Sequence, residues 1–116
     1  MISGLLYADA TTLDPFEPVG CFRDKRKPRA FPKQIKMNQS VNWRDMANSF
    51  ATIIHACAAK VFQNGCWYFG VENYKECWSG VNGSMTYNRH GRSNKCFMNY
   101  SVGAEWTIFV YRFVEG

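Results

Sequence analysis

Five cysteines give this chain of 116 residues its clearest chemical potential, since thiols form disulfides, bind metal ions or act as nucleophiles. They are Cys21, Cys57, Cys66, Cys77 and Cys96. No two of them have the C-x-x-C spacing that is typical of zinc ribbons and thioredoxin-like redox sites. The sequence also has no paired carboxylates, no G-x-S-x-G motif and no phosphate-binding loop. We therefore expect neither an enzyme nor a metal or other cofactor.

Three N-x-S sequons accompany the cysteines, at Asn38, Asn82 and Asn99. Such sequons are glycosylation sites in secreted chains, and cysteine-rich small domains are typical of oxidising compartments. We expect an extracellular protein, secreted or part of a matrix. Residues 1–10 have no basic segment and too short an apolar run for a signal peptide. No apolar run approaches the length that spans a bilayer, so we expect no membrane span.

Aromatic residues make up 16% of the chain, which is more than a core of this size must bury. Some should therefore lie on the surface, where a flat ring can stack on a sugar or a protein. The candidate stacking residues are Tyr74, Trp78, Tyr87 and Trp67, and their candidate hydrogen-bonding partners are Asn73, Glu76 and Arg89. Alternatively, Trp67 and Trp78 are core residues that cover a helix. We expect Phe22 and Trp106 to be core residues.

The net charge of +5 is concentrated between Arg23 and Lys36, where seven basic residues accompany a single acidic residue, Asp24. The candidate basic patch consists of Arg23, Lys25, Arg26, Lys27, Arg29 and Lys33. It predicts binding of sulfated or carboxylated polymers, phosphates or acidic lipid headgroups, or else it is a solvated loop. We expect no nucleic-acid partner, because no zinc-finger, RNP or helix-turn-helix pattern accompanies the charge.

The elements that must position these residues follow from periodicity. Residues 1–18 contain two prolines and acidic side chains and predict an extended arm, so a globular module should occupy residues 19–116, opening with a strand at 19–22. Apolar residues at three- and four-residue steps predict a helix over 42–63, capped by Asn42 or Ser40 and ended by Asn64 and Gly65.

Three further segments favour strands. Residues 67–72 and 77–79 should form a pair, and residues 105–114 alternate with aromatic residues on both faces, as in a central strand. One helix packed on a twisted antiparallel sheet is an α+β architecture, which we expect disulfides to stabilise.

A series of short motifs resembles the WSC and PAN/apple group, above all WSC-like modules found in secreted and matrix proteins of cnidarians and other invertebrates. The motifs are Gly20-Cys21-Phe22-Arg23-Asp24, Arg29-Ala30-Phe31-Pro32, Tyr68-Phe69-Gly70-Val71-Glu72 and Glu76-Cys77-Trp78-Ser79-Gly80. The resemblance covers roughly residues 19–114 and implies an extracellular binding module. It also implies disulfides between Cys57 and Cys77 and between Cys21 and Cys96. Cys66 would then be a buried thiol or a link to another chain.

Two functions are consistent with these features. The first is a non-catalytic module that binds carbohydrate, either a polysaccharide or a glycoprotein glycan. The second is a structural subunit of an extracellular matrix or filament that associates with its own kind. In that case its partners are other copies of itself or a matrix protein.

Overall fold

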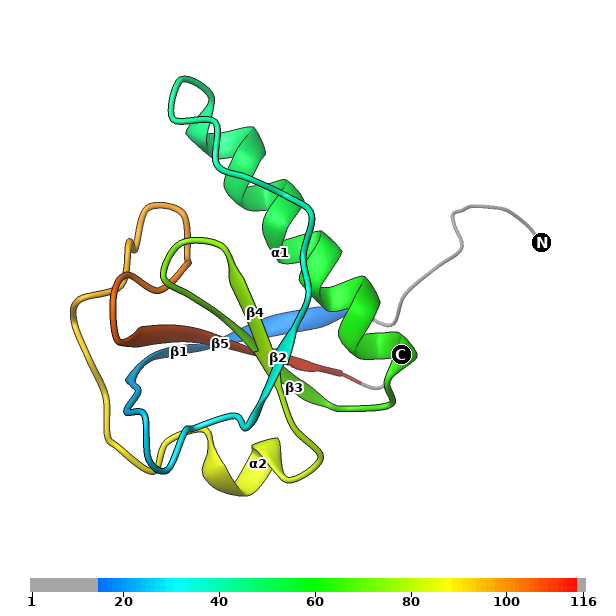
Figure 1. The fold of residues 1–116 in the computed structure, drawn as a ribbon, viewed down its shortest axis with the longest axis vertical. Coiled ribbons are helices and arrows are strands. Elements are labelled where there is room, and N and C mark those ends of the chain that lie inside the picture. The colour runs from blue at the N-terminus through cyan, green and yellow to red at the C-terminus, as the bar shows by residue number, and fades with distance from the viewer. Residues whose placement is uncertain (1–14, 115–116) are drawn as a thin grey trace.

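The computed structural model describes residues 15–114 and has the expected α+β architecture (Figure 1). Five strands form one antiparallel sheet in the order β1-β5-β3-β4-β2. The strands are β1 (Phe16–Arg23), β2 (Lys33–Ile35), β3 (Tyr68–Glu72), β4 (Glu76–Ser79) and β5 (Thr107–Phe113). The helices are α1 (Met46–Gln63) and the single turn α2 (Gly83–Thr86). No helix in this part of the chain is long and apolar enough to cross a bilayer.

Helix α1 begins four residues later than the sequence predicts and ends where expected. Asp45 is the residue before its first turn, and Asn42 instead closes a local turn: its carbonyl oxygen accepts from the Asp45 amide and its side-chain oxygen from the Arg44 amide. Asparagine side chains compete with helix formation through such local bonds. Trp43 therefore lies outside the helix and is 56% exposed. Gly65, at φ +75°, follows the helix end.

The two faces of the sheet bury different sets of side chains. The buried stripe of α1 consists of Phe50, Ile53, Cys57, Ala58 and Val61, and it packs on the face that carries Phe69, Val71, Phe109, Tyr111 and Phe113. The opposite face carries Phe22, Trp78, Ile108 and Val110, covered by Phe31. In Figure 1, α1 runs along one side of the sheet and α2 lies on the other. Both faces of β5 are therefore buried, as expected of a central strand.

Strand β1 begins before the predicted boundary of the module. Phe16 already pairs with Phe113, so residues 16–18 belong to the sheet and not to an arm. Pro18 is tolerated because β1 is an edge strand with an irregularity between Pro18 and Gly20. The rest of the expected arm, residues 1–14, lies outside the described part of the chain.

Two disulfides join the elements in the pairing that the resemblance implies. Cys57–Cys77 fastens α1 to β4, and Cys21–Cys96 fastens β1 to the loop that precedes β5. Cys66 is a free, half-buried thiol between α1 and β3.

Candidate functional site

The guanidinium of Arg29 lies at the centre of a polar and aromatic cluster on the sheet face opposite α1. Its central carbon is 3.9 Å from the centre of the Trp78 ring and 5.3 Å from that of Trp106, both within cation–π range. One of its nitrogens lies 3.1 Å from a carboxylate oxygen of Asp24 and 3.7 Å from one of Glu72. We call these five residues the arginine cluster.

Four parts of the chain bring the arginine cluster together. Asp24 follows β1, and its carboxylate accepts hydrogen bonds from the amides of Lys25 and Ala30, both at 2.8 Å, which folds the basic loop around it. Glu72 ends β3 and Trp78 lies in β4, on the same face of the sheet. Trp106 immediately precedes β5. The cluster is therefore a tertiary arrangement of distant residues.

Trp106 differs from the other members of the cluster because half of its side chain faces solvent. It is 48% exposed and has φ +53°, in the left-handed region that a bulky residue rarely adopts. Its carbonyl oxygen accepts a 3.0 Å hydrogen bond from the Asp24 amide, which helps to hold this conformation. Residues in strained backbone conformations cluster at functional sites, although Tyr74, away from this cluster, also has a positive φ. The expectation that Trp106 is a core residue is wrong.

Glu72 is the buried acid of the cluster. Desolvation by burial, followed by the neighbouring Asp24, raises the pKa of Glu72 to about 9, and the attraction of Arg29 offsets this only in part. One Glu72 oxygen has no hydrogen-bond partner, whereas Asp24 accepts from two amides and from Arg29. One cation serves two carboxyl groups, so Glu72 is the group that retains a proton at neutral pH.

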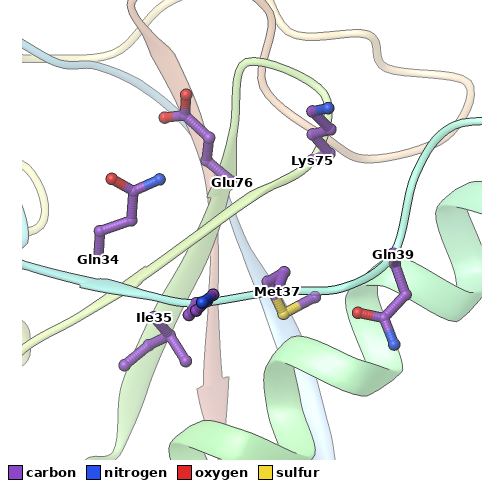
Figure 2. A pocket seen from close by; sticks show the side chains of 7 residues that line it. Gln34, Ile35, Met37, Gln39, Lys75 and Glu76 are labelled. Atoms are coloured by element: carbon purple, nitrogen blue, oxygen red, sulfur yellow. The ribbon is translucent and has the colours of Figure 1, made fainter.

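A groove of about 390 Å³ adjoins the cluster along β2 and the β3–β4 hairpin (Figure 2). It is lined by Gln34, Ile35, Lys36, Met37, Gln39, Lys75 and Glu76. Figure 2 shows Gln34 and Glu76 on the same side of the strands, with Ile35 directed away from them. Gln34 pairs with Trp78 across β2 and β4, so it shares the face of the cluster.

Glu76 connects the groove to the cluster. One carboxylate oxygen accepts a hydrogen bond from the Trp78 indole at 3.0 Å and the other accepts from the Asn73 side chain at 3.3 Å. From the β5 side, which carries Trp106, to β2, which carries Gln34, the face spans four strands and three strand spacings, or about 14 Å. The exposed ring of Trp106, the Glu76 carboxylate and the Gln34 amide therefore lie on one face of the sheet above Trp78, and we call this surface the candidate face.

The stacking platform predicted from the sequence is not one surface. Tyr74 packs against the α1 side of the sheet and Tyr87 against the opposite side, where its ring stacks on Tyr68. Trp78 is buried beneath Arg29, as expected of a core residue, but it lies on the face opposite α1 and does not cover that helix. Both tyrosines are half-buried because aromatic neighbours cover them. Of the predicted ligand-binding residues, only Glu76 and Trp78 belong to the candidate face.

The remaining predicted residues have different surroundings. Arg89 is exposed beyond α2, and Trp67 is 52% exposed just before β3, so Trp67 is not a core residue. Phe22 is buried, as expected. Within the basic patch, Arg29 is engaged by the arginine cluster and is half-buried, whereas Arg23, Lys25, Arg26, Lys27 and Lys33 are exposed. The sequon residues Asn38, Asn82 and Asn99 are also exposed, and their glycosylation stays a prediction.

Sequence reasoning missed the roles of Gln34, Glu72 and Trp106 and the inward position of Arg29. Two signals pointed to them. Asp24 is the single acid in a basic run, and Glu72 ends a strand that is otherwise apolar and aromatic. An isolated acid in either context needs a buried partner, and Arg29 serves both.

Among residues 15–114, no three histidine, cysteine, aspartate or glutamate side chains are grouped so that they could hold a metal ion. The sequence matches no protein-family model, and neither the curated proteins nor the solved structures contain a significant match to it.

Proposed function

We propose that this chain is a non-catalytic extracellular module that binds carbohydrate at the candidate face, and that it belongs to the WSC-like and PAN/apple-like group. The observation that carries the proposal is the half-exposed ring of Trp106, which borders Arg29 and lies on the same face as Glu76 and Gln34. Sugar rings present C–H faces that pack on an aromatic ring, while amides and carboxylates bind their hydroxyl groups.

Single exposed tryptophans are common on protein surfaces, and Trp43 and Trp67 are as exposed as Trp106. Trp106 is distinguished by its surroundings. Its backbone conformation and the guanidinium beside its ring restrict its movement, so it loses little entropy when a ligand stacks on it. The length of the candidate face allows contact with more than one sugar ring.

The burial of the acids supports the proposed non-catalytic role. A carboxyl group with a raised pKa beside a second carboxylate is the arrangement that glycosidases use. Glu72, however, is 2% exposed and Asp24 is 5% exposed, and both are directed to Arg29. A bound sugar would meet Trp106 and Glu76 and would not reach the protonated carboxyl group.

Two features support an extracellular location. The disulfides Cys57–Cys77 and Cys21–Cys96 need an oxidising compartment, and the three sequon asparagines are exposed. The disulfide pairing also agrees with the pattern expected for a PAN/apple-like domain, which supports membership of that group.

A glycan array, followed by titration calorimetry with the best ligand, tests the proposal. Trp106→Ala should weaken binding by roughly tenfold or more, because it removes the stacking surface. Trp67→Ala is the matched control, since Trp67 is equally exposed and lies at the opposite end of β5, where its carbonyl oxygen accepts from the Phe113 amide. Equal affinity in both variants, or no glycan bound by the wild type, would contradict carbohydrate binding at this face.

Self-association is a second candidate function, and a different surface supports it. Phe62 is 39% exposed and Trp67 is 52% exposed, and together with Phe113 they flank the thiol of Cys66 around a small pocket of about 100 Å³. A second copy that covers this apolar patch would bring two thiols together. Non-reducing gels and light scattering of native protein would detect a dimer that Phe62→Ser or Trp67→Ser abolishes, whereas a monomer at all concentrations would refute it.

A further inference from the structure

The fold brings together two basic segments that are distant in the sequence. The amide of Arg23 donates a 2.9 Å hydrogen bond to the carbonyl of Gly91, and Phe22 forms a β-bridge with Arg92. Farther along, a ring nitrogen of His90 lies 2.6 Å from the carbonyl oxygen of Pro28. Residues 22–28 and 90–92 are thus neighbours, with Arg89 next to Pro28 around a shared pocket.

We call the exposed cations of residues 22–28 and 89–92 the basic edge. They are Arg23, Lys25, Arg26, Lys27, Arg89 and Arg92. These two segments contain one acid, Asp24, which is buried and paired with Arg29. No exposed carboxylate within them neutralises the six cations, so the basic edge has a strongly positive potential.

The basic edge adjoins the candidate face. The Asp24 amide donates a hydrogen bond to the Trp106 carbonyl at 3.0 Å. This bond places Trp106 next to the backbone that joins Arg23 to Lys25. Arg29 connects the two surfaces from below, because it contacts both Asp24 and the Trp106 ring. A polymer that stacks on Trp106 would therefore extend over the basic edge.

We propose that the ligand of this module is an anionic polysaccharide, whose sulfate or carboxylate groups bind the basic edge while one sugar ring stacks on Trp106. This inference rests on the proposed function and names its substrate class. Arginine offers paired N–H donors that match a sulfate or carboxylate group, and four of the six cations are arginines. An acidic protein would satisfy the charges but would leave the adjacent stacking surface unused.

Four polymers of matched length test the inference: dextran, dextran sulfate, carboxymethyl-dextran and poly-L-glutamate. Affinity is measured by biolayer interferometry over a series of salt concentrations. Dextran sulfate and carboxymethyl-dextran should bind more tightly than either dextran or polyglutamate, and their affinity should fall steeply with salt. Polyglutamate that binds as tightly as dextran sulfate would overturn the inference, because charge alone would then explain the binding.

Paired variants locate the binding. Arg23→Gln with Arg92→Gln should weaken dextran sulfate binding by roughly fivefold, and Arg44→Gln with Lys60→Gln, which removes the same charge at and before α1, should not. Because Arg92 also lies over the Phe22 ring, a second pair, Lys25→Gln with Lys27→Gln, changes only exposed side chains and should give a similar loss. Equal losses in edge and control pairs would refute the basic edge as the site.

Trp106→Ala separates failure of the inference from failure of the proposed function. A weaker affinity of Trp106→Ala for dextran, with edge variants that bind all polymers as the wild type does, would overturn the anionic ligand and support the carbohydrate site. Alternatively, the edge variants alone could lose dextran sulfate binding while Trp106→Ala binds as the wild type does. That result would overturn carbohydrate stacking at this face, and also the inference that one polymer contacts both surfaces.

Discussion

Replacing Glu72 with glutamine should change how the stability of this domain depends on pH. In the folded protein the pKa of Glu72 is raised to about 9, mainly by burial and then by Asp24, whereas its ordinary value is 4.5. Between these values the folded chain keeps a proton that the unfolded chain has released. Raising the pH therefore favours unfolding, and the contribution of Glu72 to stability is present below about pH 4.5 and lost progressively up to about pH 9.

The slope of this dependence follows from proton linkage. One proton difference changes the free energy of unfolding by about 1.4 kcal/mol per pH unit, so about 4 kcal/mol separates pH 5 from pH 8. The uncharged amide of Glu72→Gln resembles the protonated acid in shape and cannot ionise. The variant should lose this slope, and the difference in stability between variant and wild type should shift in favour of the variant as pH rises.

Urea unfolding of the wild type and Glu72→Gln at a series of pH values measures the effect. Glu105→Gln, at an exposed position just before Trp106, is the control and should follow the wild-type curve. An offset between the two curves at low pH, where Glu72 is protonated in both states, reports altered contacts with Arg29 and is separate from the predicted change of slope. Parallel stability curves over the whole pH range would refute the reasoning, because they would mean that Glu72 titrates alike in the folded and unfolded states.

Two further predictions concern the frame that holds the candidate face. Changing both Cys21 and Cys96 to alanine should lower the free energy of unfolding by about 4 kcal/mol on the loop-entropy model, because the bridge closes a sequence separation of 75 residues; calorimetry showing an unchanged melting temperature would contradict this. Gly103→Ala should unfold or strongly destabilise the domain, because the new methyl group would lie 2.0 Å from the Thr107 carbonyl oxygen. Gly65→Ala is the control: its methyl group meets no atom within 4 Å, so it should cost only about 1–2 kcal/mol of strain in the left-handed conformation. Similar circular dichroism melts for the two glycine variants would show that the close approach at Gly103 is easily relieved.

Much of the frame was predictable because its signals are local. The apolar stripe of α1 and the Asn64–Gly65 pair that follows it predicted the helix and its end, and the two-residue alternation of β5 predicted a strand buried on both faces. The predicted start of α1 was wrong because Ser40, Asn42 and Asp45 are all acceptable capping residues. Which of them is used depends on the turn that Asn42 closes, and local propensity does not rank these alternatives.

The candidate site was predictable only in part because it depends on contacts between distant segments. Trp78 and Trp106 are the same residue type, and one is buried while the other is half-exposed because β5 begins one residue after Trp106. Arg29 looked like any other cation of the basic run. Its inward position follows from Asp24 and Glu72, and the second of these lies 43 residues away, a pairing that no sequence period reports.

The antiparallel pairing of β1 with β5 places the two ends of the described chain at one end of the sheet and the candidate face toward the other. Phe16 is opposite Phe113, so the described chain enters and leaves at the same end of the sheet. Trp106 and Arg23 lie at the other end, about 20 Å away along a seven-residue strand. Neighbouring domains, tags or a surface tether attached at either end of this segment would therefore leave the end with Trp106 pointing outward. The same layout makes the segment suited to insertion into a loop of another protein, where it would display the candidate face without obstruction.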